Sequence, residues 1–220
     1  MFKRITLTLT AFAFSAMAQA TLIDFTDANW QAAIGSGNSS ATLGNVTLST
    51  GNPYHILNFN SSSSEIKGCA AGADVHDLAC LGDGIGIRRK WNNNDEISGS
   101  ERLLIEFAKA VDVTKIYLLD LFGEEKYGKD EKAIIFNSNG IKKTVNGAVG
   151  VAGGFLSVEY SLNEGGGLSS ILLKGYRDCF SDFALAGLEV TPSAVPVPGA
   201  AILFGSALLG FFGFKRRQAA

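Results

Sequence analysis

Residues 102–122 read Arg-Leu-Leu-Ile-Glu-Phe-Ala-Lys-Ala-Val-Asp-Val-Thr-Lys-Ile-Tyr-Leu-Leu-Asp-Leu-Phe. In the first part of this stretch Leu103, Ile105 and Phe107 stand at every second position, which predicts a strand with one mostly apolar face. The second part, Val111 to Phe122, is the most apolar stretch of its region and predicts another strand, in mid-sheet, with both faces largely covered. This stretch therefore favours a β domain.

The sequence on either side of this stretch breaks into short strands separated by turn residues. A single brief helix is expected, capped by Asp27 and stopped by Gly35. Asn139-Gly140 is a strong hairpin signal. The other expected strands cover residues 21–25, 42–48 (two pieces around Gly44-Asn45), 54–59, 84–91, 133–136, 141–145, 155–160, 168–174 and 183–190. The pattern predicts an all-β fold, an antiparallel β-sandwich resembling a jelly roll, with a barrel as the alternative.

The N-terminus has the three parts of a secretory signal peptide. Lys3-Arg4 is a basic start, Ile5–Met17 is apolar, and Ala18-Gln19-Ala20 is a small-x-small cleavage site. We expect residues 1–20 to be removed by signal peptidase, so that the mature chain begins at Thr21.

The C-terminus carries a proline motif, an apolar run and a basic stop. The motif is Val195-Pro196-Val197-Pro198, the run is 199–214, and Lys215, Arg216 and Arg217 follow within the tail 215–220. A helix over the run would extend roughly 24 Å at about 1.5 Å per residue, and the basic side chains can snorkel to extend its reach. The pattern predicts a transmembrane helix with its basic end in the cytoplasm. An ordinary membrane anchor is the alternative to a sorting signal.

This tail resembles the PEP-CTERM sorting signal of Gram-negative bacteria over about 25 residues. The commonest form of that signal has Glu between the prolines, whereas Val197 stands there in this chain, as in Val-Pro-Leu-Pro-like variants. The resemblance implies that an exosortase-like membrane transpeptidase reads the tail, cleaves near the proline motif, and releases the protein to the cell surface or extracellular matrix. The family context also implies an association with extracellular polysaccharide.

A weaker resemblance covers the region between the two ends. Leu81-Gly82, Asp95-Glu96-Ile97, the strand from Glu101 to Phe107 and Ser181-Asp182-Phe183 are similar to the β-sandwich ectodomains found upstream of such signals. Most of those domains have no assigned function. The resemblance therefore implies a fold for residues 21–191, with 192–198 as linker and sorting motif, but no chemistry.

The charge of residues 21–191 argues against nucleic acid as a partner. Five of the 19 basic residues lie in the two ends, whereas all 21 acidic residues lie in the domain, so its net charge is about −7. Nucleic acids and anionic membrane surfaces select clustered cations. The composition suits an exported soluble domain.

Three cysteines, Cys69, Cys80 and Cys179, lie in a domain expected to enter an oxidising compartment, where disulfides persist. A local Cys69–Cys80 bridge is the first choice, because only ten residues separate the two. Cys179 is then buried or free, unless it pairs with Cys69 or Cys80 in place of that bridge.

Binding residues are suggested by two local patterns. Carboxylate and amide oxygens suit Ca²⁺, so Asn92, Asn94, Asp95 and Glu96 form a candidate structural calcium site, to which Asp24 or Asp182 could add a ligand. No other cofactor is expected. Trp91 and Tyr176 are candidates for stacking on sugar rings, although the alternative that each ring fills the core is favoured.

No catalytic motif stands out, so a non-enzymatic role is expected. Asp95, Glu96 and Glu101 offer carboxylates for glycoside hydrolysis, but a solvated acidic loop is the favoured interpretation. We expect a structural or adhesive component of the exopolysaccharide or biofilm matrix. The alternatives are a carbohydrate-binding module and, behind it, a glycan hydrolase.

Overall fold

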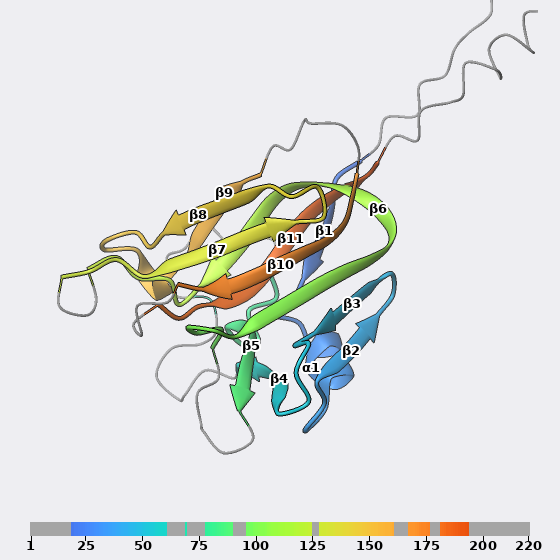
Figure 1. The fold of residues 1–220 in the computed structure, drawn as a ribbon, viewed down its shortest axis with the longest axis horizontal. Helices are drawn as coiled ribbons and strands as arrows, with labels where there is room; N and C mark the ends of the chain where they lie inside the picture. Colours follow the sequence, from blue (N-terminus) through green and yellow to red (C-terminus); the bar gives the residue numbers. More distant parts are fainter. Residues whose placement is uncertain are drawn as a thin grey trace, which may run out of the picture.

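One strand, β6 (Arg102–Leu119), is 18 residues long and pairs with four other strands. Its first half lies between β3 (Val46–Ser49) and β10 (Leu168–Gly175). Its second half lies between β9 (Leu156–Glu159) and β11 (Ala184–Pro192). All four pairings are antiparallel, so β6 joins two groups of strands into one sheet (Figure 1).

The expectation of two separate strands in residues 102–122 is wrong. Residues 108–110 are exposed and interrupt the apolar pattern, yet they include no glycine or proline to turn the chain. The backbone therefore stays extended, and the amide of Ala108 bonds the carbonyl oxygen of Asn45 at 2.9 Å.

The computed structural model describes residues 19–60, 69, 78–89, 96–124, 128–160, 167–176 and 181–193. Within these residues the fold is mostly antiparallel β structure, which confirms the expected all-β class. The remaining elements are β1 (Thr21–Asp24), α1 (Ala28–Ile34), β2 (Ser40–Leu43), β4 (His55–Asn60), β5 (Gly84–Arg89), β7 (Lys132–Asn137), β8 (Lys142–Asn146) and the 3-10 turn η1 (Ala152–Gly154).

The sheet has two branches that share β6. The first branch contains β2, β3, the first half of β6, β10, β7 and β8. The second branch contains β9, the second half of β6, β11, β5, β4 and β1. Alternate residues of each strand point to opposite faces. The inward side chains of both branches belong to a single apolar core, which includes Ile105 and Ile171 from the first and Ile87 and Leu188 from the second.

The outer face of the second branch carries a smaller apolar cluster. Leu119 and Ala186 are fully buried there beside Cys69, and Leu78 and Cys80 pack against them. Cys69 and Cys80 form a disulfide, which is the pair that their spacing favours. The bridge therefore ties residues 69 and 80 to the outer surface of β6 and β11.

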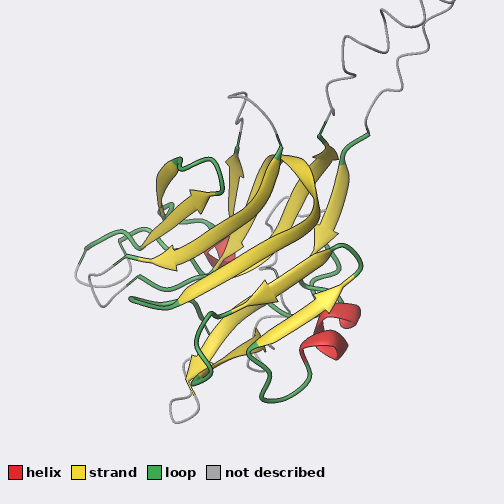
Figure 2. Cartoon of the chain, turned by 45° about the vertical axis from the view of Figure 1, so that its right-hand side comes forward, coloured by secondary structure: helices red, strands yellow, loops and turns green. Residues whose placement is uncertain are grey.

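The helix α1 begins and ends as its sequence predicts. The Asp27 side chain accepts hydrogen bonds from the amides of Asn29 and Trp30, and Gly35 follows the last turn. Trp30 and Ile34 are buried, and the Trp30 ring lies 5.0 Å from that of Phe25. The helix lies beside the β2–β3 hairpin (Figure 2).

Among the described residues, no helix has the length and apolar character that a membrane crossing requires. The predicted transmembrane segment 199–214 and signal peptide residues 1–18 lie outside the described residues.

We expect the disulfide to contribute to stability by restricting the unfolded chain. Replacing both Cys69 and Cys80 with Ala should lower the free energy of unfolding by about 2–3 kcal/mol, the loop-entropy value for so short a loop. Denaturant titration of the wild type with and without a reducing agent measures the same quantity. Equal midpoints for the reduced and oxidised wild type would contradict the assignment.

Candidate functional site

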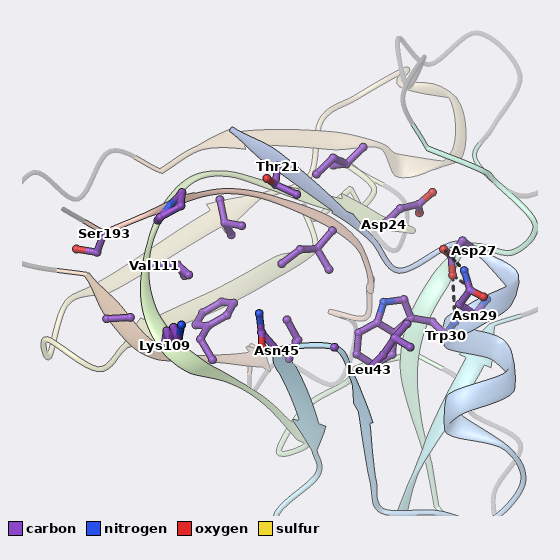
Figure 3. Close-up of a pocket in the computed structure, with 18 residues that line it drawn as sticks. Thr21, Asp24, Asp27, Asn29, Trp30, Leu43, Asn45, Lys109, Val111 and Ser193 are labelled. Atoms are coloured by element: carbon purple, nitrogen blue, oxygen red, sulfur yellow. Dashed lines mark hydrogen bonds between the residues drawn. The ribbon is translucent and has the colours of Figure 1, made fainter. Parts of the chain in front are cut away.

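A groove of about 1060 Å³ opens where β1, the β2–β3 turn and the middle of β6 come together (Figure 3). Its inner wall is apolar and includes Trp30, Val46 and Phe107, each less than 10% exposed. Leu43 lies at the outer part of the groove with 36% of its surface exposed. The groove therefore offers a hydrophobic wall that water and a ligand can reach.

The groove exists because β6 passes from one branch to the other at this point. Phe107 still pairs with Val46 of β3, whereas Val111 already pairs with Pro192 of β11. Between these positions the flanking strands diverge. No periodic pattern in the sequence marks such a gap, because it arises from two partner strands that are far apart along the chain.

The carboxylates beside the groove have structural partners. Asp27 Oδ1 accepts bonds from the amides of Asn29 at 2.9 Å and Trp30 at 3.0 Å. Asp24 accepts from the Thr26 amide and hydroxyl and from the amide of Ala79. These two groups hold the chain in place. Other polar side chains that line the groove are those of Thr21, Asn45, Lys109 and Ser193.

The calcium prediction falls mostly outside the described residues. Asn92, Asn94 and Asp95 are not described, whereas Glu96 and Asp182 are both half-buried. The amide of Ile97 bonds the carbonyl oxygen of Phe183 at 2.8 Å, so the segments that carry Glu96 and Asp182 run side by side. Within the described residues no group of three or more potential metal ligands is present. The calcium site stays a prediction.

The two glycan-stacking candidates have different outcomes. Trp91 is outside the described residues. Tyr176 follows β10 at the surface with 40% exposure, so it does not fill the core. The Lys132 ammonium lies 5.2 Å from the centre of its ring, a cation–π arrangement. This contact places a positive charge next to an accessible aromatic ring.

Glu101, one of the three carboxylates considered for hydrolysis, is a buried structural group. Its side chain is 1% exposed and accepts a bond from Arg89 Nε at 3.1 Å. The amide and hydroxyl of Ser98 bond its other oxygen at 3.0 and 3.2 Å. The carboxylate therefore joins β5 to the start of β6. Glu96 is half-buried, and Asp95 is outside the described residues.

We expect Glu101→Gln to lower the free energy of unfolding by about 3 kcal/mol, because it leaves the Arg89 charge and the Ser98 donors imperfectly paired. Glu106→Gln is the matched control, in β6 and five residues further along the chain. Glu106 is exposed, so its replacement should change stability by less than about 0.5 kcal/mol. Urea unfolding compares the two variants, and equal effects would show that the buried carboxylate is not a structural group.

The sorting motif 195–198 and the basic residues 215–217 lie outside the described residues, as does Cys179. Comparison of the chain with protein-family models and with curated proteins finds no match in either.

Proposed function

We propose that the protein is exported and sorted to the cell surface, where it serves as a structural or adhesive component of an exopolysaccharide matrix. In this proposal residues 1–20 are a signal peptide, and residues 195–217 are a signal read by an exosortase-like transpeptidase of a Gram-negative inner membrane. The role is non-enzymatic.

The observation that carries the proposal is the pairing of the first and last described strands. Thr21 of β1 lies opposite Val190 of β11, so the domain begins and ends at the same place (Figure 1). Gln19, Ala20 and Thr21 are exposed, which leaves the proposed Ala20–Thr21 cleavage site accessible to a peptidase. Cleavage there removes no described strand, and a tail following Pro192 can hold the domain from one end.

The disulfide is a second supporting feature. Disulfides persist in the periplasm and outside the cell, and they are rare in the cytosol of mesophiles. A bridge between Cys69 and Cys80 on the outer face of the second branch suits a protein that folds after export.

We further propose that the fold is a jelly-roll-like sandwich in which the two branches are the two layers. Strands β4 and β8 are the two ends of the main strand order, with no pairing between them. This open arrangement favours a sandwich over the alternative of a closed barrel.

Intact-mass measurement of the protein isolated from its native cells tests the proposal. The expected species begins at Thr21, ends near the Val-Pro-Val-Pro motif, and has the mass of a chain with one disulfide. A full-length chain of 220 residues, folded and reduced in the cytosol, would overturn the assignment.

Replacing both Pro196 and Pro198 with Ala should leave the C-terminal segment attached, because the motif presented to the transpeptidase is lost. Pro53→Ala is the matched control, since Pro53 is exposed and lies far from the tail along the chain. The mass of the control should equal that of the wild type, and normal processing of the double variant would exclude the proline motif as the signal.

A carbohydrate-binding module is the second candidate function. The exposed position of Tyr176 beside Lys132 favours it, because an accessible aromatic ring is the usual platform for a sugar face.

A further inference from the structure

The outer face of the first branch is a regular surface formed by six neighbouring strands. We call this surface the open face and define it by the outward residues of β2, β3, β6, β10, β7 and β8. The outward side chains of β2, of the start of β6 and of β8 are exposed. On the corresponding face of the second branch, Cys69, Leu78 and Cys80 pack against Leu119 and Ala186. The two outer faces are therefore not equivalent.

Strand register aligns the side chains of the open face in rows. One row runs across five strands through Ser49, Leu104, Leu172, Phe136 and Lys142. Its three central members are half-buried, so they form an apolar strip that solvent still reaches. The Ser49 hydroxyl lies at one end of the strip and the Lys142 ammonium at the other. The Lys142 Nζ lies 5.8 Å from the centre of the Phe136 ring.

The next row places two cations side by side, since Arg102 lies directly opposite Lys174 on the neighbouring strand. Beyond it, the Tyr176 amide bonds the Lys132 carbonyl oxygen at 3.1 Å, which brings the Tyr176 ring and the Lys132 ammonium to the same end of the face. Neighbouring strands are about 4.8 Å apart. The cations therefore lie along one side of the apolar strip and at its Lys142 end, whereas Glu106 lies in the row on the other side.

The charge of the open face is opposite to that of the domain. Its outward strand positions hold four cations, Arg102, Lys132, Lys142 and Lys174, and a single acid, Glu106. A domain with a net charge near −7 thus gathers cations on one face.

A depression at one end of the apolar strip adds a shaped contact. Its volume is about 450 Å³, and Arg102, Leu104 and Leu172 line it together with His55 and Thr50. It combines an apolar floor, a guanidinium and hydroxyl groups. A ring with an apolar face and a carboxylate substituent fits such a combination, because the ring packs on the leucines while the guanidinium forms charge-assisted bonds.

We propose that the open face binds an acidic polysaccharide whose repeat contains uronic acid residues. Sugar rings lie on the strip of Leu104, Leu172 and Phe136, and their carboxylates pair with Arg102, Lys142 and the neighbouring lysines. This inference rests on the proposed function, because export brings the face into contact with polysaccharide and keeps it away from cytosolic nucleic acid. The matrix polymer that the domain binds is then a polysaccharide with uronic acid residues.

Calorimetric titration of the purified full protein with polygalacturonate tests the inference, with dextran and double-stranded DNA as comparison polymers. Polygalacturonate should bind at low salt and lose most of its affinity at about 0.5 M NaCl, because exposed charge pairs are screened. Arg102→Gln combined with Lys142→Gln should weaken binding about tenfold or more.

Lys109→Gln is the control, since Lys109 is also exposed but lies at the groove on another part of the molecule and should change affinity less than twofold. Thermal unfolding of each variant verifies that it is folded. The inference is overturned if polygalacturonate does not bind, if dextran or DNA binds equally well, or if Lys109→Gln weakens binding as much as the double variant.

The titration tests the polysaccharide inference and the mass measurement tests the export proposal, and a negative result in one does not imply a negative result in the other. Binding is measured on the purified chain, so a negative result leaves the export assignment intact. A chain that is not processed would be seen in the mass measurement whether or not the open face binds the polymer.

Discussion

The hydrogen bonding of β6 is the constraint on which the rest of the structure depends. A buried backbone group without a partner costs about as much as a lost hydrogen bond, so a long interior strand requires neighbours on both edges. Strands β3 and β10 supply them for the first half, and β9 and β11 supply them for the second. These partners precede and follow β6 in the sequence, so β6 connects parts of the chain that are far apart along it.

The change of partners along β6 has a structural consequence at residues 108–111. There the neighbouring strand changes from β3 to β11, and the groove opens between them. A cost in exposed apolar surface accompanies this gap, since Leu43 at its outer part is 36% exposed. The groove is thus a product of topology, and its position next to β1 and the end of β11 places it at the end of the domain where the chain enters and leaves.

Much of the fold follows from local sequence. Asp27 caps α1, Gly44-Asn45 separates β2 from β3, and Asn139-Gly140 lies in the turn between β7 and β8, as predicted. Prediction from local sequence fails where the pairing with neighbouring strands determines the structure. Lys109 stands at a break in the apolar pattern, yet the strand continues through it because β6 needs only an extended backbone and a new neighbour.

The candidate surfaces were harder to predict for a related reason. Arg102, Lys142 and Lys174 are far apart in the sequence, and each is an ordinary surface cation within its own strand. Only the register of β6, β7, β8 and β10 brings them to one face. The exposure of Tyr176 likewise depends on the end of β10, whereas its sequence context favoured a core position. The pairing register between strands determines which residues share a face of the sheet, and the hydrophobic pattern within a single strand does not show it.

The separation of charge between the open face and the rest of the domain also bears on which polyanion the face accepts. At physiological ionic strength a charge acts over about 8 Å. A single polysaccharide chain lying on the strip passes Arg102 and Lys142, and Glu106 is the single acid at the outward strand positions of this face. A wide duplex brings phosphates past the edge of the face, toward a domain whose remaining charge is strongly negative. The same four cations therefore favour a narrow polymer with spaced carboxylates over a broad one with dense charge.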